Sequence, residues 1–340
     1  MKFRLPRWLQ RPLWARRRPR IRLPGRRPRA PGRWIEQRYA APGARPLDYH
    51  LYEPAELGGA GRPLLVMLHG CKQSALEFAA GARLGRLADR DGFLVLCPQQ
   101  SARANPMRCW NWFDAATLAG QGESGLIADL IRETIERRGV DPRRVHVAGM
   151  SAGAAMARIL AVRHGGLFAR CALHSGLMFG AANSPLMALS AMRSGAAGDP
   201  SALSAEPLRA GRPLHPVPTL VIQGLSDRVV NPANADQISR QCCDLAAAAA
   251  ASGAAPAPRM AVSERSWLEG ERQCVQVDYT LADALVVRKI TIAGLAHAWS
   301  GGDPGYPFND PAGPDATALM GDFFAAAQTV PSARGMSSPG

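Results

Sequence analysis

The nine residues Val145–Gly153, VHVAGMSAG, constrain the fold of this chain more than any other stretch. A short run rich in valine leads into the pentapeptide GMSAG, and an alanine-rich segment follows at once. This order predicts a strand, a sharp turn and a helix, with Ser151 at the apex of the turn. Gly149 and Gly153 remove the side chains that would collide where strand and helix cross closely. We therefore interpret Ser151 as a candidate nucleophile, with an ordinary turn serine as the alternative.

Candidate strands alternate with helical segments along the rest of the chain. The candidate strands cover residues 64–68, 93–97, 171–175, 217–223 and 285–292, and the helical segments cover residues 75–91, 124–138, 152–164, 233–251 and 315–328. Residues 64–68 are continuously apolar. Continuous apolar runs are typical of strands that are buried on both faces of a parallel sheet. Helices between such strands predict right-handed crossovers. We expect an α/β fold with a mostly parallel sheet, an edge strand at 47–52 and a strand pair within 259–280.

Composition changes divide the chain into three parts. Residues 1–40 are rich in arginine and proline, and the first 33 residues contain no acidic residue, although the whole chain carries a net charge of +14. We expect a disordered arm there, which is either a solvated tail or an anchor to a polyanion, a membrane surface or a granule. Residues 41–330 should form one catalytic domain, with 177–214 as a possible cap insertion over the site, and residues 331–340 a flexible tail.

The composition also excludes several classes of protein. Seven cysteines in 340 residues do not make a disulfide scaffold, and they show no zinc-ligand spacing, so we expect no metal and no organic cofactor. The basic start is not followed by the apolar run of a secretory signal. No apolar stretch is long enough to span a membrane. We expect the protein to be cytoplasmic, with granule association possible through the arm. The sequence does not reveal the oligomeric state.

A serine nucleophile needs a base, and the base needs a third group that holds it. In folds of this type the partners follow the serine in the order acid and then histidine, each after a strand end. Asp227 follows the run 217–223, and His297 follows the run 285–292. The rival acids are Asp283 and Asp303, and the rival bases are His50, His69, His146, His164, His174 and His215. We expect Ser151, Asp227 and His297 to form the catalytic triad.

The negative charge that develops on an attacked carbonyl oxygen needs two fixed N–H donors. The amide of Ala152 lies at the start of the helix after the turn, where the helix dipole is positive. The second donor should come from the loop after Leu68, and we assign it to the amide of Cys71 because Gly70 allows a tight turn before it. For His69, bonding within the loop and contact with a substrate remain equal alternatives.

Four motifs in order resemble the poly(3-hydroxybutyrate) depolymerase family of esterases. They are LHGC at 68–71, CWNWF at 109–113, GMSAG at 149–153 and GLAHAWSGG at 294–302. The resemblance covers about residues 45–328 and implies an α/β-hydrolase fold. It also implies cleavage of short-chain hydroxyalkanoate esters, either poly(3-hydroxybutyrate) or its oligomers, through an acyl-enzyme. It supports the triad given above and Cys71 at the oxyanion hole.

The resemblance has further implications for the surroundings of the site. It suggests that Trp110, Trp112 and Trp299 border the substrate groove, with core packing as the alternative. It also hints at a disulfide between Cys71 and Cys109, although a reducing cytosol argues against one. A link from Cys242 or Cys243 to Cys274 is a weaker possibility.

The substrate does not follow from the fold. Secreted members that degrade polymer carry a signal peptide and a polymer-binding domain, and this sequence shows neither, which favours intracellular granules or soluble oligoesters. Related members cleave feruloyl or acetyl esters of plant polysaccharide, so these esters are the alternative. A different class of function, a granule- or polyanion-binding protein, rests on the basic arm alone.

Overall fold

The structure, a computed structural model, describes residues 31–41, 43, 45–55, 61–200, 202, 215–251 and 259–326. Most of the predicted arm, the end of the predicted cap and the predicted tail therefore lie outside the described residues. All described residues belong to the unit Pro31–Gly340, to which the following description is confined. None of the described helices combines the length and the apolar character that crossing a bilayer requires.

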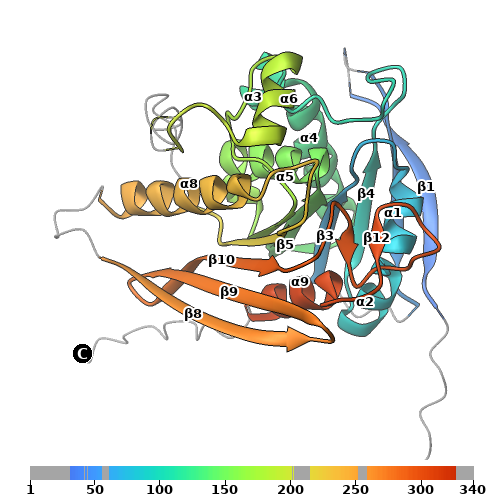
Figure 1. Cartoon of the computed structure of the whole chain (residues 1–340). Helices are drawn as coiled ribbons and strands as arrows, with labels where there is room; N and C mark the ends of the chain where they lie inside the picture. Colours follow the sequence, from blue (N-terminus) through green and yellow to red (C-terminus); the bar gives the residue numbers. More distant parts are fainter. Residues whose placement is uncertain are drawn as a thin grey trace, which may run out of the picture. The chain divides into compact units, whose positions relative to one another are not determined.

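A ten-stranded sheet forms the centre of the described fold (Figure 1). Its strands are β1 (Arg33–Tyr39), β2 (Leu47–Glu53), β3 (Arg62–Leu68), β4 (Leu94–Gln99), β5 (Val140–Met150), β6 (Arg170–His174), β7 (Thr219–Gly224), β8 (Met260–Glu269), β9 (Arg272–Leu281) and β10 (Ala284–Ile292). They are arranged in the order β1-β2-β4-β3-β5-β6-β7-β10-β9-β8. The run from β4 to β10 in this order is parallel, while β1, β2, β9 and β8 pair antiparallel at the two sides.

Helices cover both faces of the sheet, as the apolar parallel strands require. They are α1 (Ala75–Gly81), α2 (Leu84–Asp91), α3 (Ala115–Leu118), α4 (Gly122–Arg138), α5 (Ala152–Arg163), α6 (Pro185–Ser194), α8 (Ala233–Ala250) and α9 (Ala316–Ala325), with a 3-10 turn at Gly165–Leu167. Residues of α4, α5 and α8 share one buried apolar cluster, and residues of α1, α2 and α9 share the other (Figure 1). The expected α/β class with a mostly parallel sheet is confirmed.

The described cap region, 177–200, is helical rather than stranded and contains α6. A small second sheet joins β11 (Trp299–Ser300) to β12 (Asn309–Asp310) in parallel. This pair fixes the backbone immediately after the candidate base.

Three expectations from the sequence were wrong in detail. The arm does not extend to residue 40, because Arg33–Tyr39 form β1, which pairs with β2 and makes 47–52 an inner strand. The expected single helix 75–91 is two helices, since Arg83 takes a left-handed conformation with φ 56° between α1 and α2. Charged residues on β1 hid this strand from the sequence pattern, and the break between α1 and α2 falls just after Gly81.

Candidate active site

The candidate site lies where the carboxyl ends of parallel strands meet at one edge of the sheet. His69 follows β3, Ser151 follows β5, His174 ends β6, and Asp227 follows β7. Candidate base His297 lies in the loop after β10, which pairs in parallel with β7. Ligands of open α/β sheets bind at this edge, so the topology brings the predicted residues to the expected place.

Ser151 occupies a strained position between β5 and α5. Its backbone has φ 56° and ψ −123°, which places it in the left-handed half of conformational space. A side chain on Gly149 would collide with the backbone of Gly153, and a side chain on Gly153 would collide with the carbonyl of Leu68. The two glycines therefore allow strand, turn and helix to pack closely around Ser151, as the pentapeptide predicts.

His297 and Asp227 are bonded to each other directly. Nδ1 of His297 lies 2.8 Å from Oδ2 of Asp227. The other carboxylate oxygen, Oδ1, accepts hydrogen bonds from the amides of Val229 and Val230, both at 2.9 Å. Burial acts to raise the pKa of Asp227, but the bond to His297, its charge and the two loop amides outweigh burial and lower the pKa. Asp227 is therefore a fixed anion that can hold the imidazole with Nδ1 protonated.

His174 connects Ser151 to the segment that carries His297. Its carbonyl accepts a hydrogen bond from the amide of Ser151 at 2.9 Å. Its ring stacks on Trp299, with centroids 5.0 Å apart, and its Nε2 accepts from the amide of Ser300 at 3.4 Å. Burial, with a smaller contribution from nearby His297, lowers the pKa of His174 to about 3. A neutral, packed His174 is a positioning residue, which agrees with its rejection as the base.

The loop after β3 lies against the nucleophile turn. A Cβ on Gly70 would stand 3.4 Å from Cβ of Ser151, which places the following amide of Cys71 beside the candidate nucleophile. Among the hydrogen bonds shown for the described residues, none uses the amide of Cys71 or of Ala152 as donor. The prediction that these two amides bind an oxyanion belongs to the proposed function below.

His69 is a structural residue of this loop. It is fully buried, Nδ1 lies 2.8 Å from the Gly70 carbonyl, and Nε2 accepts from the amide of Gln100 at 3.1 Å. Burial lowers the pKa of His69 to about 4, so the ring is neutral near pH 7. Of the two alternatives for His69, bonding within the protein is the one that the structure shows.

A disulfide joins Cys71 to Cys109 and fixes the CWNWF loop to the loop after β3. Cys242, Cys243 and Cys274 are free, so the weaker alternative pairing is wrong. The carboxylate of Glu123 also holds this loop, because it accepts from the amide of Asn111 at 2.8 Å and from its Nδ2 at 2.7 Å.

The three tryptophans expected at a substrate groove are core residues in this structure. Trp110, Trp112 and Trp299 are exposed by 0%, 4% and 2%. Trp110 donates from Nε1 to the carbonyl of His69, and Trp299 donates to Oγ1 of Thr317. The alternative of core packing holds, since each side chain is committed to neighbours rather than open to a ligand.

Sequence reasoning missed the polar residues that contact Asp227 and the neighbouring loops. Gln223, the penultimate residue of β7, directs Nε2 toward Oδ2 of Asp227 at 3.4 Å and toward the Val230 carbonyl at 3.2 Å. Gln223 and His174 are buried polar side chains at strand ends, and Glu123 is a partly buried one beside the CWNWF loop. A buried polar group at such a position was the available signal. We find no group of three or more possible metal ligands in the part of the chain that the structure describes.

Known proteins resemble this chain in sequence and in fold. A family model described as "Esterase PHB depolymerase" matches residues 47–264. Poly(3-hydroxyalkanoate) depolymerase C of Paucimonas lemoignei is 32% identical over 204 residues, which are 58% of this chain and 49% of that protein. Feruloyl esterase B of Thermothelomyces thermophilus is 32% identical over 138 residues, which are 40% of this chain and 46% of that protein. The chain spans about half the length of these curated relatives.

Among solved structures, an acetyl xylan esterase from Aspergillus awamori superposes with a TM-score of 0.63. The match covers 77% of this chain and 94% of that one at 21% identity, so it supports the α/β-hydrolase fold alone. The matched family region contains Ser151 and Asp227 and stops before His297. With the family model matching well over half of the sequence, this chain belongs to the Esterase PHB depolymerase family.

Proposed function

We propose that this protein hydrolyses carboxylic esters through an acyl-enzyme formed on Ser151. The observation that carries the proposal is the His297–Asp227 hydrogen bond at the same sheet edge as the strained Ser151 turn. The contact of His297 with Ser151 belongs to the proposal, and its support is the short connection through His174. Family membership supports the same chemistry.

Each proton has a defined place in the proposed reaction. Nε2 of His297 takes the hydroxyl proton as Oγ of Ser151 attacks the ester carbonyl carbon. The imidazolium that forms is stabilised by Asp227, and it then gives the proton to the leaving alcohol. Water attacks the acyl-enzyme in the second half, with His297 again as base, which releases the acid and restores Ser151. The amides of Ala152 and Cys71 would hold the oxyanion in both halves.

We propose short-chain hydroxyalkanoate esters, poly(3-hydroxybutyrate) or its oligomers, as the substrates. The family model and the similarity to a poly(3-hydroxyalkanoate) depolymerase support this class. Feruloyl and acetyl esters are the alternative, supported by the similarity to feruloyl esterase B and to acetylxylan esterases. The two groups of substrates differ in the acid that becomes attached to Ser151.

A panel of substrates tests both the proposed mechanism and the proposed substrate class. 3-Hydroxybutyrate oligomers, amorphous polymer granules, methyl ferulate and acetylated xylan would be compared by kcat/KM, with Ser151→Ala as the matched inactive control. We expect the oligomers to be hydrolysed best and Ser151→Ala to lose roughly 10⁶-fold in turnover. If methyl ferulate or acetylated xylan is hydrolysed best, the substrates are feruloyl or acetyl esters and not hydroxyalkanoate esters. Near-normal turnover by Ser151→Ala would refute the mechanism.

We also propose that the basic arm attaches the enzyme to a polyanion or a granule surface. Its support is the charge of the sequence alone, because residues 1–30 lie outside the described residues.

A further inference from the structure

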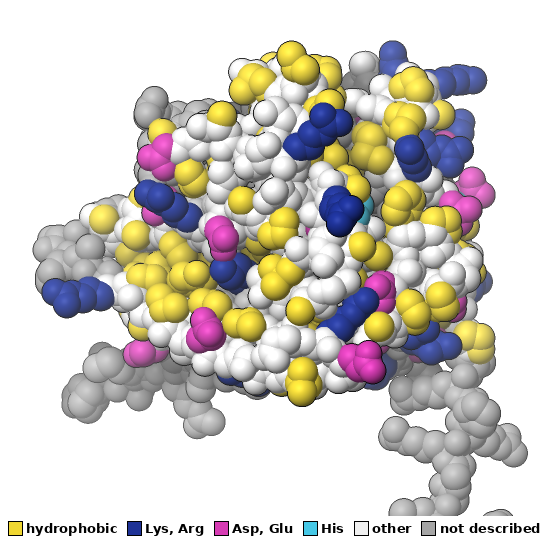
Figure 2. Space-filling view, viewed as in Figure 1, with side chains coloured by type: hydrophobic (Ala, Val, Ile, Leu, Met, Phe, Trp, Pro, Cys, Tyr) yellow, Lys and Arg dark blue, Asp and Glu magenta, His cyan; other side chains and the backbone are white. Residues whose placement is uncertain are grey.

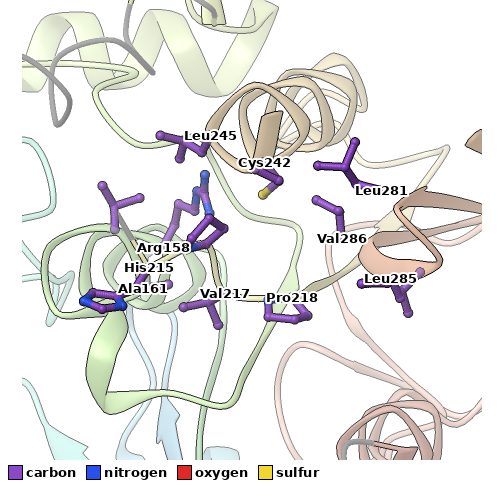
Figure 3. A pocket seen from close by; sticks show the side chains of 14 residues that line it. Arg158, Ala161, His215, Val217, Pro218, Cys242, Leu245, Leu281, Leu285 and Val286 are labelled. Carbon is purple, nitrogen blue, oxygen red and sulfur yellow. The ribbon is translucent and has the colours of Figure 1, made fainter. Parts of the chain in front are cut away.

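A pocket of about 220 Å³ lies at the end of the parallel strands opposite to the end that carries Ser151. Figure 3 shows the side chains that line this pocket. Its described lining comes from the residues before β7, the end of β9, the start of β10, the last turns of α5 and the carboxyl half of α8. These positions precede the parallel strands, whereas the candidate active site follows them. Hydrophobic side chains gather over α8 and β10 on this face of the molecule (Figure 2). The pocket is therefore separate from the catalytic residues.

Arg158 of α5 is the one charged side chain among the described residues that line this pocket. It is only 2% exposed, and Nε donates to Oε1 of Gln241 at 3.1 Å. Nη2 is buried and has no hydrogen-bond partner among the described residues. The same Gln241 oxygen also accepts from the amide of Phe179 at 3.0 Å, so it is shared rather than dedicated to the guanidinium.

A buried guanidinium without an anion is costly, because the desolvation of its charge is not compensated. No carboxylate of the described chain forms an ion pair with Arg158, and none of the described lining residues is acidic. In Figure 3 the guanidinium rises between the surrounding side chains toward Cys242 and Leu245. Its planar fork is suited to binding a carboxylate.

Besides a negative charge for Arg158, a ligand of this pocket needs an apolar part that matches the pocket walls. Val217, Leu245 and Val286 line the pocket with apolar side chains, and His215 stands exposed at its rim. A small inorganic anion would satisfy the guanidinium and leave these walls in contact with water. A carboxylate with a short apolar chain satisfies both, since the chain removes the apolar walls from water.

We propose that this pocket binds a small monocarboxylate with a short apolar chain, its carboxylate against Arg158. At about 30 Å³ for each water-sized group, the volume holds roughly seven or eight non-hydrogen atoms. Hexanoate has this size and serves as the probe. A fatty acid and a hydroxyalkanoate share this chemistry, and the latter would be a product of the proposed reaction.

Calorimetric titration of sodium hexanoate into the full-length Ser151→Ala protein tests the proposal without hydrolysis. We expect saturable binding that Arg158→Met weakens by about tenfold or more, because the carboxylate loses its charged partner. Ala284→Phe keeps the charge and narrows the pocket at an exposed position, so it should also weaken binding and remains informative if Arg158→Met fails to fold. Arg132→Met, at an exposed arginine of α4, is the matched control and should bind as the parent does.

Two further ligands complete the test. Hexan-1-ol has the same chain without the charge and should bind at least about tenfold more weakly. Comparison of 3-hydroxybutyrate with hexanoate distinguishes a product acid from a fatty acid as the source. No saturable binding, or binding that neither Arg158→Met nor Ala284→Phe changes, would overturn the proposal. Because the titration uses an inactive variant, its failure leaves the proposed esterase activity untouched.

Discussion

Ser151 adopts a backbone conformation that costs an ordinary residue on the order of 1–3 kcal/mol. The surrounding fold supplies the compensation. The amide of Ser151 donates to the carbonyl of His174, and the close approach of Gly153 to β3 fixes the start of α5. The strain is consistent with a hydroxyl that must project from the sheet edge rather than pack against it.

Replacing Asp227 with Asn should lower kcat by roughly 10³–10⁴. The amide can donate to Nδ1 of His297, which would leave Nε2 protonated and unable to accept the Ser151 proton. The measurement is hydrolysis of p-nitrophenyl butyrate at saturating substrate. Asp283→Asn is the control, because Asp283 was the rival acid and its φ of 63° suits asparagine. Equal losses in both variants would remove Asp227 from the triad.

The positions of Ser151, Asp227 and His297 could be predicted because each closely follows a segment whose sequence indicates a strand. The role of His174 could not be predicted from the sequence. Its ring contacts residues 299–300, which are distant in sequence, and no local pattern encodes that pairing. The prediction that the tryptophans border a groove was wrong for a related reason. An aromatic residue in a sequence motif gives the same pattern whether its side chain packs in the core or lines a groove.

The disulfide between the loop after β3 and the CWNWF loop gives a prediction at the scale of elements. It closes a loop with a sequence separation of 38 residues, which the chain-entropy model values at about 4 kcal/mol. The double variant Cys71→Ser, Cys109→Ser should lose up to about this free energy of unfolding, together with some activity, since the Cys71 amide would be less firmly held. Urea unfolding and kcat measure the two effects.

Cys243→Ser changes a free, half-buried thiol and serves as the control for this experiment. Dithiothreitol should destabilise the wild type and leave the double variant unchanged. Equal stability of wild type and double variant would contradict the prediction. Such bridges persist mainly in oxidising compartments, so the cytoplasmic address expected from the sequence stays a prediction.

The order of helices and strands was largely predictable because the period of the apolar pattern changes with each element. The exceptions lie where tertiary contacts decide. β1 contains two arginines and a glutamate, and it is held by pairing with β2 and by the Arg33–Glu53 ion pair rather than by an apolar run. The break at Arg83 is stabilised by a hydrogen bond from its side chain to the Gly301 carbonyl, 218 residues away.

At the scale of the whole molecule, the basic arm can be tested apart from the catalytic unit. Deletion of residues 1–30 should leave kcat on soluble p-nitrophenyl butyrate unchanged, since the described fold begins at Pro31. Binding to heparin or to anionic polymer granules should be lost. For the full chain, the same binding should weaken as salt rises, because each phosphate or sulfate contact releases counterions. Binding that survives the deletion would show that the arm is not the anchor.

Stability against acid is a property of the whole fold, and buried neutral histidines should govern it. His146 in β5 stacks on Phe324 at 4.4 Å, and its Nδ1 has no partner among the described residues. Burial, with smaller effects from Arg170 and Arg144, lowers its pKa to about 3. The unfolded chain binds this proton near pH 6.5 and the folded chain does not, so stability falls as pH drops from about 6.5 toward 3. This one group accounts for up to about 1.4 kcal/mol per pH unit in that window.

Replacing His146 with Phe removes the difference in proton binding and keeps the aromatic contacts. We expect the variant to match the wild type at pH 8 and to exceed it by about 2 kcal/mol at pH 5, measured by urea unfolding at both values. His69 and His174 remain, so part of the acid sensitivity of the wild type should persist. His215→Phe, at an exposed position, leaves all three buried rings in place and should follow the wild type. If His146→Phe lost stability between pH 8 and pH 5 as steeply as the wild type, burial of this ring would not be a source of the acid sensitivity.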